Sequence, residues 1–92
     1  MRINKMVFYS DAGHGWLKVP IAELRKRNLM DKISEYSYRK GDYAYLEEDC
    51  DLVELFDSFL SDGIPVEEIK AAIKSAKPVT NSRIRNYARF YK

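Results

Sequence analysis

The chain has little cysteine, histidine or tryptophan: each occurs once in 92 residues. A lone Cys50 excludes an intramolecular disulfide and fits a reducing compartment. A lone His14 lacks the further His or Cys ligands that a zinc site needs. No run approaches the roughly 20 apolar residues of a membrane span, and residues 1–10 lack the apolar stretch of a signal peptide. We therefore expect a cytoplasmic protein with no metal and no membrane segment.

Glycine and proline are also scarce, at four and three residues. Without a Gly- or Pro-rich linker, an internal repeat or a low-complexity stretch, the chain reads as a single domain, 1–92, with 79–92 as a basic C-terminal segment. Hydrophobic residues make up 46% of the chain, which suits one small core. A core of this size can barely enclose a catalytic cleft, so the sequence argues against an enzyme.

Two long stretches each carry side-chain charges of a single sign, negative in the first and positive in the second. Residues 47–68 have no Lys or Arg and residues 69–92 have no Asp or Glu. The first stretch carries nine carboxylates: Glu47, Glu48, Asp49, Asp51, Glu54, Asp57, Asp62, Glu67 and Glu68. The second carries seven basic side chains: Lys70, Lys74, Lys77, Arg83, Arg85, Arg89 and Lys92. Such opposed fields steer association with partners and do not specify a fold.

The apolar pattern predicts alternating strands and helices. Strands are expected over 6–9 and 16–19, a helix from Pro20, and two more strands over 33–39 and 43–47 around a hairpin loop at 40–42. A second helix follows, capped by Asp49 or Asp51 and ended by Gly63. A third runs from Pro65 toward Pro78, and 81–92 is either a strand or a basic tail. The predicted class is α+β: an antiparallel sheet of about four strands with two or three helices on one face.

No catalytic set stands out. His14 lies between two glycines, where it could act as a general base oriented by Asp11, or simply be exposed in a hairpin loop. The carboxylates around Cys50 raise the pKa of a thiol, so this cysteine is expected to be inert. We assign no catalytic residue and no cofactor.

The acidic cluster Glu47, Glu48, Asp49 and Asp51 has three interpretations. It could bind a divalent cation, although it lacks the glycine and ligand spacing of an EF-hand loop. It could mimic nucleic-acid phosphates and enter a basic groove on a partner. It could also reflect the helix dipole, which favours carboxylates in a first turn. We select the four residues as candidate partner contacts.

The basic candidates are Arg83, Arg85 and Arg89, which alternate with aromatic residues. Arginine binds phosphates and aromatic rings stack on bases, so the segment suits RNA or single-stranded nucleic acid. It suits an acidic protein surface equally, and the arginines could instead pair with the acidic helix. Arg25, Lys26 and Arg27 form a second basic patch, more often a solvated helix face. The hairpin tyrosines Tyr36, Tyr38, Tyr43 and Tyr45 resemble a stacking platform, but a tyrosine face covering the core is favoured.

Four stretches carry a resemblance: FYSDxGHGWLxVP at 8–20, IxxYSY at 33–38, YLEEDCD at 45–51 and SxIRxY at 82–87. They resemble a family of small uncharacterised proteins of bacteriophages, plasmids and other mobile elements, and imply no enzymatic activity. By size and charge the chain is also similar to anti-CRISPR proteins. That similarity implies docking on a host ribonucleoprotein complex, through Cas subunits and possibly guide RNA, and a block on target DNA.

The sequence is thus compatible with three functions. The first is a non-enzymatic, phage-encoded inhibitor of a host CRISPR-Cas surveillance complex. The second is a small nucleic-acid-binding module that uses the basic, aromatic C-terminal arm. The third is an enzyme using His14 and Asp11. The partner's identity and the oligomeric state are left open.

Overall fold

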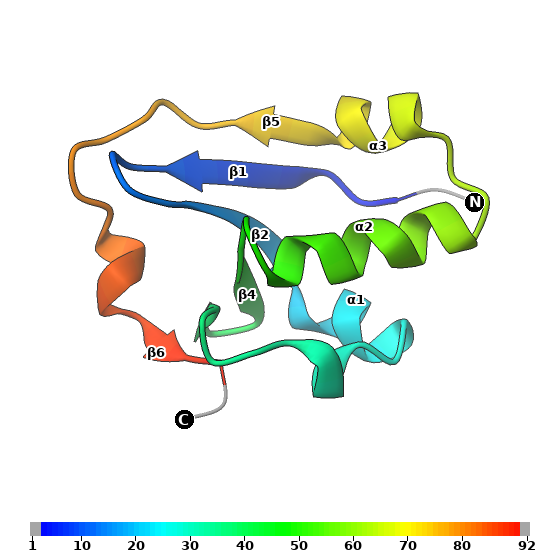
Figure 1. Ribbon diagram of the computed structural model, residues 1–92, viewed down its shortest axis with the longest axis horizontal. Helices are drawn as coiled ribbons and strands as arrows, with labels where there is room; N and C mark the ends of the chain where they lie inside the picture. Colours follow the sequence, from blue (N-terminus) through cyan, green and yellow to red (C-terminus); the bar gives the residue numbers. More distant parts are fainter. Residues whose placement is uncertain (1–2, 91–92) are drawn as a thin grey trace.

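The computed structural model describes residues 3–90, and their backbone forms one six-stranded sheet with helices packed on it (Figure 1). The strands are β1 (Met6–Ser10), β2 (Gly15–Pro20), β3 (Tyr38–Lys40), β4 (Tyr43–Glu47), β5 (Ile73–Ser75) and β6 (Ala88–Arg89). The helices are α1 (Ile21–Lys26), α2 (Asp51–Ser61) and α3 (Val66–Ala72), with 3₁₀ turns η1 (Met30–Lys32) and η2 (Arg83–Asn86). The predicted α+β class is confirmed, with six strands in place of four.

The strand order is β5-β1-β2-β4-β3-β6. Every pair is antiparallel except β1 with β5, which run parallel. The β3–β4 hairpin turns at Gly41 and Asp42, as expected. Gly41 has a φ of +61°, a backbone conformation that glycine adopts without steric cost.

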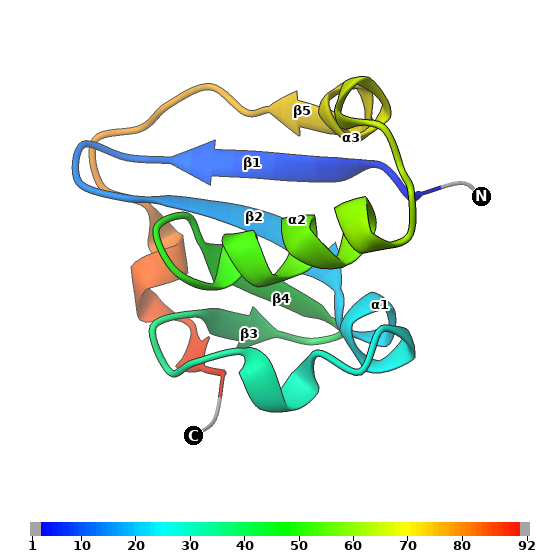
Figure 2. The same cartoon turned by 45° about the vertical axis from the view of Figure 1, so that its right-hand side comes forward.

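One face of the sheet is covered by the helices. Figure 2 shows α2 lying across it, with α3 and α1 on either side of its C-terminal end. Alternate residues of β2 and β4 point to this side, where Leu17 and Leu46 are fully buried with Leu55 and Phe59 of α2. The apolar repeat of α2 at i, i+3 and i+4 predicted this packing.

The opposite face is aromatic and is covered by the C-terminal arm, defined here as residues 79–90. Trp16, Tyr45 and Ile84 are buried there, with Tyr9, Tyr38 and Tyr87 packed against them. Strand register explains the grouping: Tyr9 lies opposite Trp16, and Tyr38 lies opposite Tyr45. Residues directly opposite in an antiparallel pair share a face.

The expected strand over 33–39 is wrong for most of its length, because β3 begins only at Tyr38. The carboxylate of Asp51 accepts hydrogen bonds from the Ser34 N–H, the Ser34 hydroxyl and the Ser37 hydroxyl at 3.1, 2.8 and 2.5 Å. These contacts offer the backbone an alternative to a sheet ladder. They also correct the predicted cap: Cys50 is the N-cap residue of α2, with no side-chain capping bond.

The third helix ends at Ala72, well before Pro78. Residues 73–75 turn into β5 and pair with β1, whose free edge offers unpaired backbone groups. The ambiguous stretch from 81 forms η2 and β6, and the Ser82 hydroxyl caps η2 by accepting from the Ile84 N–H at 3.2 Å. Lys92, the last of the basic residues, lies outside the described range.

Candidate nucleic-acid interface

A hollow of about 700 Å³ lies between the arm and the aromatic face of the sheet. We call it the first hollow. Its wall is made by Tyr9, Ser10, Lys18, Tyr45, Lys77, Val79, Asn81, Ser82, Arg83, Ile84, Asn86 and Tyr87. Three of these side chains are cationic, three are tyrosines and none is a carboxylate. The first hollow therefore attracts anions and offers rings to stack on.

The tyrosines of the first hollow pack on one another. The Tyr45 ring lies 5.0 Å from that of Tyr87 and 6.3 Å from that of Tyr9, measured between centroids. Burial, and then the neighbouring Tyr87 and Tyr9, raise the pKa of Tyr45 to about 12. The phenol is thus protonated at neutral pH and adds no negative charge to the wall.

Two lysines, Lys18 of the first hollow and Lys40 outside it, lie over rings at the edge of this face. The Lys18 ammonium is 4.3 Å from the centroid of Tyr43, and the Lys40 ammonium is 5.0 Å from that of Tyr87. Both distances are within the range of cation–π attraction. These lysines come from β2 and β3, so the sheet itself contributes positive charge beside the arm.

An ion pair anchors the arm to the β1–β2 loop. Arg85 donates to both carboxylate oxygens of Asp11, from Nε at 2.7 Å and from Nη2 at 2.8 Å. The same carboxylate accepts from the Ser82, Gly13 and His14 backbone N–H groups. The Arg85 guanidinium, followed by these N–H groups, holds the pKa of Asp11 well below its usual range. Asp11, whose side chain is 1% exposed, therefore fixes the arm in place.

The three predicted arginines have different surroundings. Arg83 is exposed in the wall of the first hollow. Arg85 is occupied by Asp11 and does not pair with the acidic helix, which corrects that interpretation. Arg89 lies 4.8 Å from the centroid of Tyr38 and donates to the Glu35 carbonyl at 3.1 Å. Of the three, Arg83 is the one placed for an outside anion.

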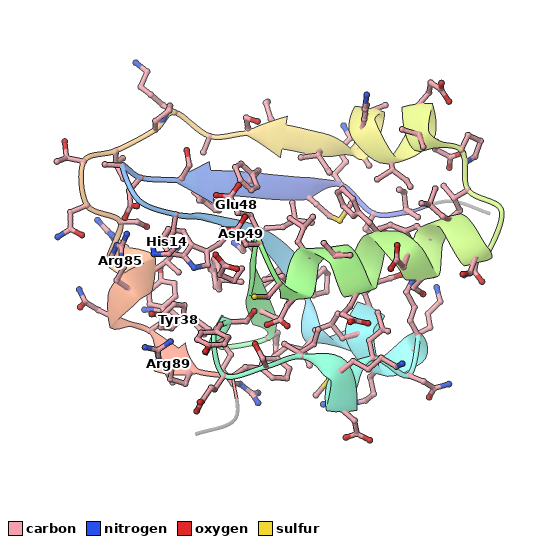
Figure 3. The ribbon with its side chains drawn as sticks, in the orientation of Figure 1. His14, Tyr38, Glu48, Asp49, Arg85 and Arg89 are labelled. Carbon is pink, nitrogen blue, oxygen red and sulfur yellow. The ribbon has the colours of Figure 1, made fainter. Side chains whose placement is uncertain are left out.

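The acidic cluster is divided by the fold. Asp51 is buried and bound to serines, and Glu47 is buried at the end of β4. Glu48 and Asp49 are exposed beside the start of α2 (Figure 3). Of the four candidate partner contacts, Glu47 and Asp51 are therefore buried and only Glu48 and Asp49 lie on the surface. Across residues 3–90, no group of three or more His, Cys, Asp or Glu side chains is arranged to hold a metal ion.

A second hollow, of about 430 Å³, lies on the other side of the arm. Its wall is made by His14, Trp16, Tyr36, Tyr38, Glu47, Asp49, Cys50, Arg85 and Arg89. Figure 3 shows His14 and Arg85 together near the β1–β2 loop, with Tyr38 and Arg89 next to each other beyond them. Unlike the first hollow, it holds charges of both signs.

His14 and Cys50, the two residues considered for catalysis, both lie close to Glu47. Asp11 contacts the backbone of His14 and not its ring, so the predicted orienting role is wrong; the ring Nδ1 lies 3.4 Å from Glu47 Oε2. The Cys50 thiol is exposed, and partial desolvation, followed by the Glu47 and Asp51 carboxylates, raises its pKa. A raised pKa leaves little nucleophilic thiolate.

The second basic patch is reduced to two residues. Arg25 and Lys26 are exposed on α1. The Arg27 side chain is only 4% exposed and is bound to Glu23 and Asp62 at 2.7 and 2.6 Å. It also lies over the Phe59 ring at 4.3 Å. Arg27 therefore joins α1 to α2 and is not part of a binding patch.

Sequence reasoning missed Lys77 and Tyr9 as wall residues. The β1 and β2 alternation could have placed Tyr9 and Lys18 on one face. Nothing local marks Lys77, which reaches the first hollow because β5 adds to the edge of the sheet.

No family model, curated protein or solved structure matches the chain. The resemblance to mobile-element proteins thus stays a prediction. Within the described residues, no helix has the length and apolar character to cross a membrane.

Proposed function

We propose that this protein binds single-stranded nucleic acid on its aromatic face, with the first hollow as the principal contact. The observation that carries the proposal is the composition of that wall: Lys18, Lys77 and Arg83 beside three tyrosines, with no carboxylate among the residues that line it. Basic grooves with rings for base stacking are how proteins hold single strands.

The fold also separates several of the nine carboxylates from the first hollow. Asp57 and Glu67 are exposed on α2 and α3, and these helices pack on the opposite face of the sheet. A strand lying along the arm would meet cations first. A single strand fits better than a duplex, because unpaired bases can stack on Tyr9 or Tyr87 and meet the amides of Asn81 and Asn86.

Fluorescence anisotropy with a labelled 12-nucleotide oligouridylate tests the proposal. Binding should weaken with salt, with a slope of about −2 in log K against log[salt] if three phosphates are neutralised. The double variant Lys77→Glu, Arg83→Glu should bind at least about tenfold more weakly and with a shallower salt slope. The matched control is Arg25→Glu, Lys26→Glu, which makes the same charge change on α1. An equal loss in both variants, or a flat salt response, would contradict a defined interface.

A second candidate is the non-enzymatic inhibitor that docks on a host CRISPR-Cas complex. It is favoured by the outer side of α2, where Val53 and Leu60 are each 48% exposed around Asp57. Glu48 and Asp49, just before α2, are also exposed. Apolar side chains with a polar surround are typical of protein-binding patches.

A pull-down from lysate of a CRISPR-bearing host, with and without nuclease, separates the two candidates. Cas subunits retained after nuclease and lost in Glu48→Lys, Asp49→Lys would support the inhibitor. Nucleic acid lost on nuclease treatment, with retention sensitive to Lys77→Glu, Arg83→Glu, would support binding through the first hollow alone.

A further inference from the structure

The second hollow contains a buried carboxylate with unused hydrogen-bonding capacity. The Glu47 side chain is 9% exposed. Its Oε1 accepts from the Asp49 N–H at 2.8 Å and its Oε2 lies 3.4 Å from His14 Nδ1, and the carboxylate also accepts a hydrogen bond from the Cys50 thiol. A carboxylate has about four lone-pair sites. Glu47 can therefore still accept from a ligand that enters the hollow.

The other side chains in the wall of the second hollow offer planar surfaces on which a planar ligand can stack. The Arg85 guanidinium lies 5.5 Å from the Trp16 ring centroid, and Arg89 lies over Tyr38. Tyr36, on the rim, is 61% exposed and offers a free ring. Bases stack on both aromatic rings and guanidinium planes. The Trp16 indole N–H, buried in the same wall, has no hydrogen-bond partner within residues 3–90, an unmet donor that costs stability.

The charged side chains of the second hollow further limit the class of ligand that it can bind. Glu47 and Asp49 repel a phosphate, while Arg89, and more weakly Arg85 because Asp11 pairs with it, repel the cationic side chain of a partner protein. The ligand that suits this hollow is therefore a neutral, planar group with N–H donors on one edge. Guanine presents two adjacent donors, N1–H and the 2-amino group. Adenine and cytosine place a ring acceptor beside their amino group, and uracil flanks its single N–H with carbonyls.

We propose that the second hollow is a guanine site, in which Glu47 accepts from N1–H and the 2-amino group of an unpaired base. This inference rests on the proposed function and adds base preference to it. The two hollows adjoin through η2, since Arg83 and Asn86 line the first and Arg85 lines the second. A strand whose phosphates meet Arg83 can thus extend a base past η2 toward Glu47.

Trp16 is the only tryptophan and lines this hollow, so its fluorescence provides a binding signal; because Trp16 also packs with Tyr45 and Ile84 of the first hollow, base preference is read from the comparison between strands. We would titrate the protein with three heptanucleotides, UUUGUUU, UUUAUUU and UUUIUUU. Inosine keeps N1–H but lacks the 2-amino group. The guanine strand should bind about 5- to 150-fold more tightly than the other two, the range for one good bidentate base contact. This comparison uses the unaltered protein and does not depend on a variant that folds.

Glu47→Gln supplies the second readout. The amide oxygen can still accept from the Asp49 N–H, but the side chain cannot accept from two ligand donors at once. The variant should lose the preference for guanine over inosine and keep its affinity for UUUUUUU. Glu48→Gln is the matched control, because it removes the same charge from an exposed neighbour that does not line the hollow.

The outcomes separate this inference from the proposed function. Equal affinity for all three strands would overturn the guanine site and leave single-strand binding standing. No binding to any strand would remove both. A Trp16 response to an arginine-containing peptide, with none to guanosine monophosphate, would assign the hollow to a protein side chain and overturn the proposal.

Discussion

The two faces of the sheet are held by different physical forces. On the helix side, aliphatic and aromatic side chains such as Leu17, Leu55 and Phe59 pack at 0–1% exposure. On the arm side, tyrosines pack beneath a segment fixed by the Asp11–Arg85 ion pair. The first face buries apolar area and determines stability. The second leaves rings, cations and hollows at the surface, and these features carry the proposed binding.

The largest expected effect is on the helix side. Phe59→Ala removes a ring that is 1% exposed and should lower the free energy of unfolding by about 3–5 kcal/mol. Urea unfolding followed by circular dichroism measures it. Leu60→Ala, one residue further and 48% exposed, is the control and should change stability by less than about 1 kcal/mol. Equal losses would mean that α2 does not pack as described.

The second prediction concerns the hydrogen bonds that join Asp51, at the start of α2, to the segment before β3. Asp51→Ala leaves the donors of Ser34 and Ser37 without their acceptor, which should cost about 1–3 kcal/mol. Asp57→Ala, from the exposed side of the same helix, should be close to neutral. If both variants behave alike in urea unfolding, Asp51 contributes only a negative charge near the start of α2.

The same contrast explains what the sequence could predict. The i, i+3, i+4 repeat of α2 and the alternation of β2 and β4 are local patterns, and they predicted the helix side correctly. Asp51 shows where local rules fail: its position suggested a cap, but its carboxylate binds two serines 14 and 17 residues away. Those contacts end the strand expected over 33–39.

The candidate site was predicted only in part. Arg83 was selected because basic and aromatic residues alternate around it, and the structure leaves it exposed. Arg85 looked identical in sequence, yet its partner Asp11 lies 74 residues away. Glu47 looked like a surface carboxylate within an acidic run, but strand register places it opposite Trp16 and buries it. Sequence spacing predicts neither the pairing of Arg85 nor the burial of Glu47, because both result from contacts between segments that are far apart in the sequence.

The third prediction concerns a variant that should destabilise only the arm side of the sheet. Arg85→Ala should leave the helix side intact and open the arm locally, so that the Ile84 and Tyr87 amides exchange their hydrogens about tenfold faster or more. The Leu55 amide in α2 should keep its protection. Arg25→Ala, from the exposed surface of α1, controls for loss of one positive charge. Faster exchange of Leu55 would show that the arm and the helix side unfold as one unit.

Acid should weaken the arm in the same way. The pKa of Asp11 is lowered from its ordinary value of 3.8 in the folded protein. Its contribution is therefore complete above that ordinary value and declines as pH falls below it toward the folded-state pKa. Exchange at Ile84, once corrected for the intrinsic pH dependence of exchange, should accelerate below about pH 4. In Asp11→Asn this acceleration should be absent, and its persistence would point to another carboxylate.

The smallest effect concerns the tyrosine wall. The Tyr45 pKa of about 12 lies above its ordinary value of 10.0, so the folded state disfavours the phenolate. The stability tied to this group is complete below pH 10 and is lost as pH rises from 10 toward 12. Tyr45→Phe cannot ionise, so it should gain stability relative to the unaltered protein across that interval. Urea unfolding at pH 9 and pH 11 measures the change. Tyr36→Phe, on an exposed residue outside the strands, is the control. A matching gain in Tyr36→Phe would mean that burial under the arm does not set this titration.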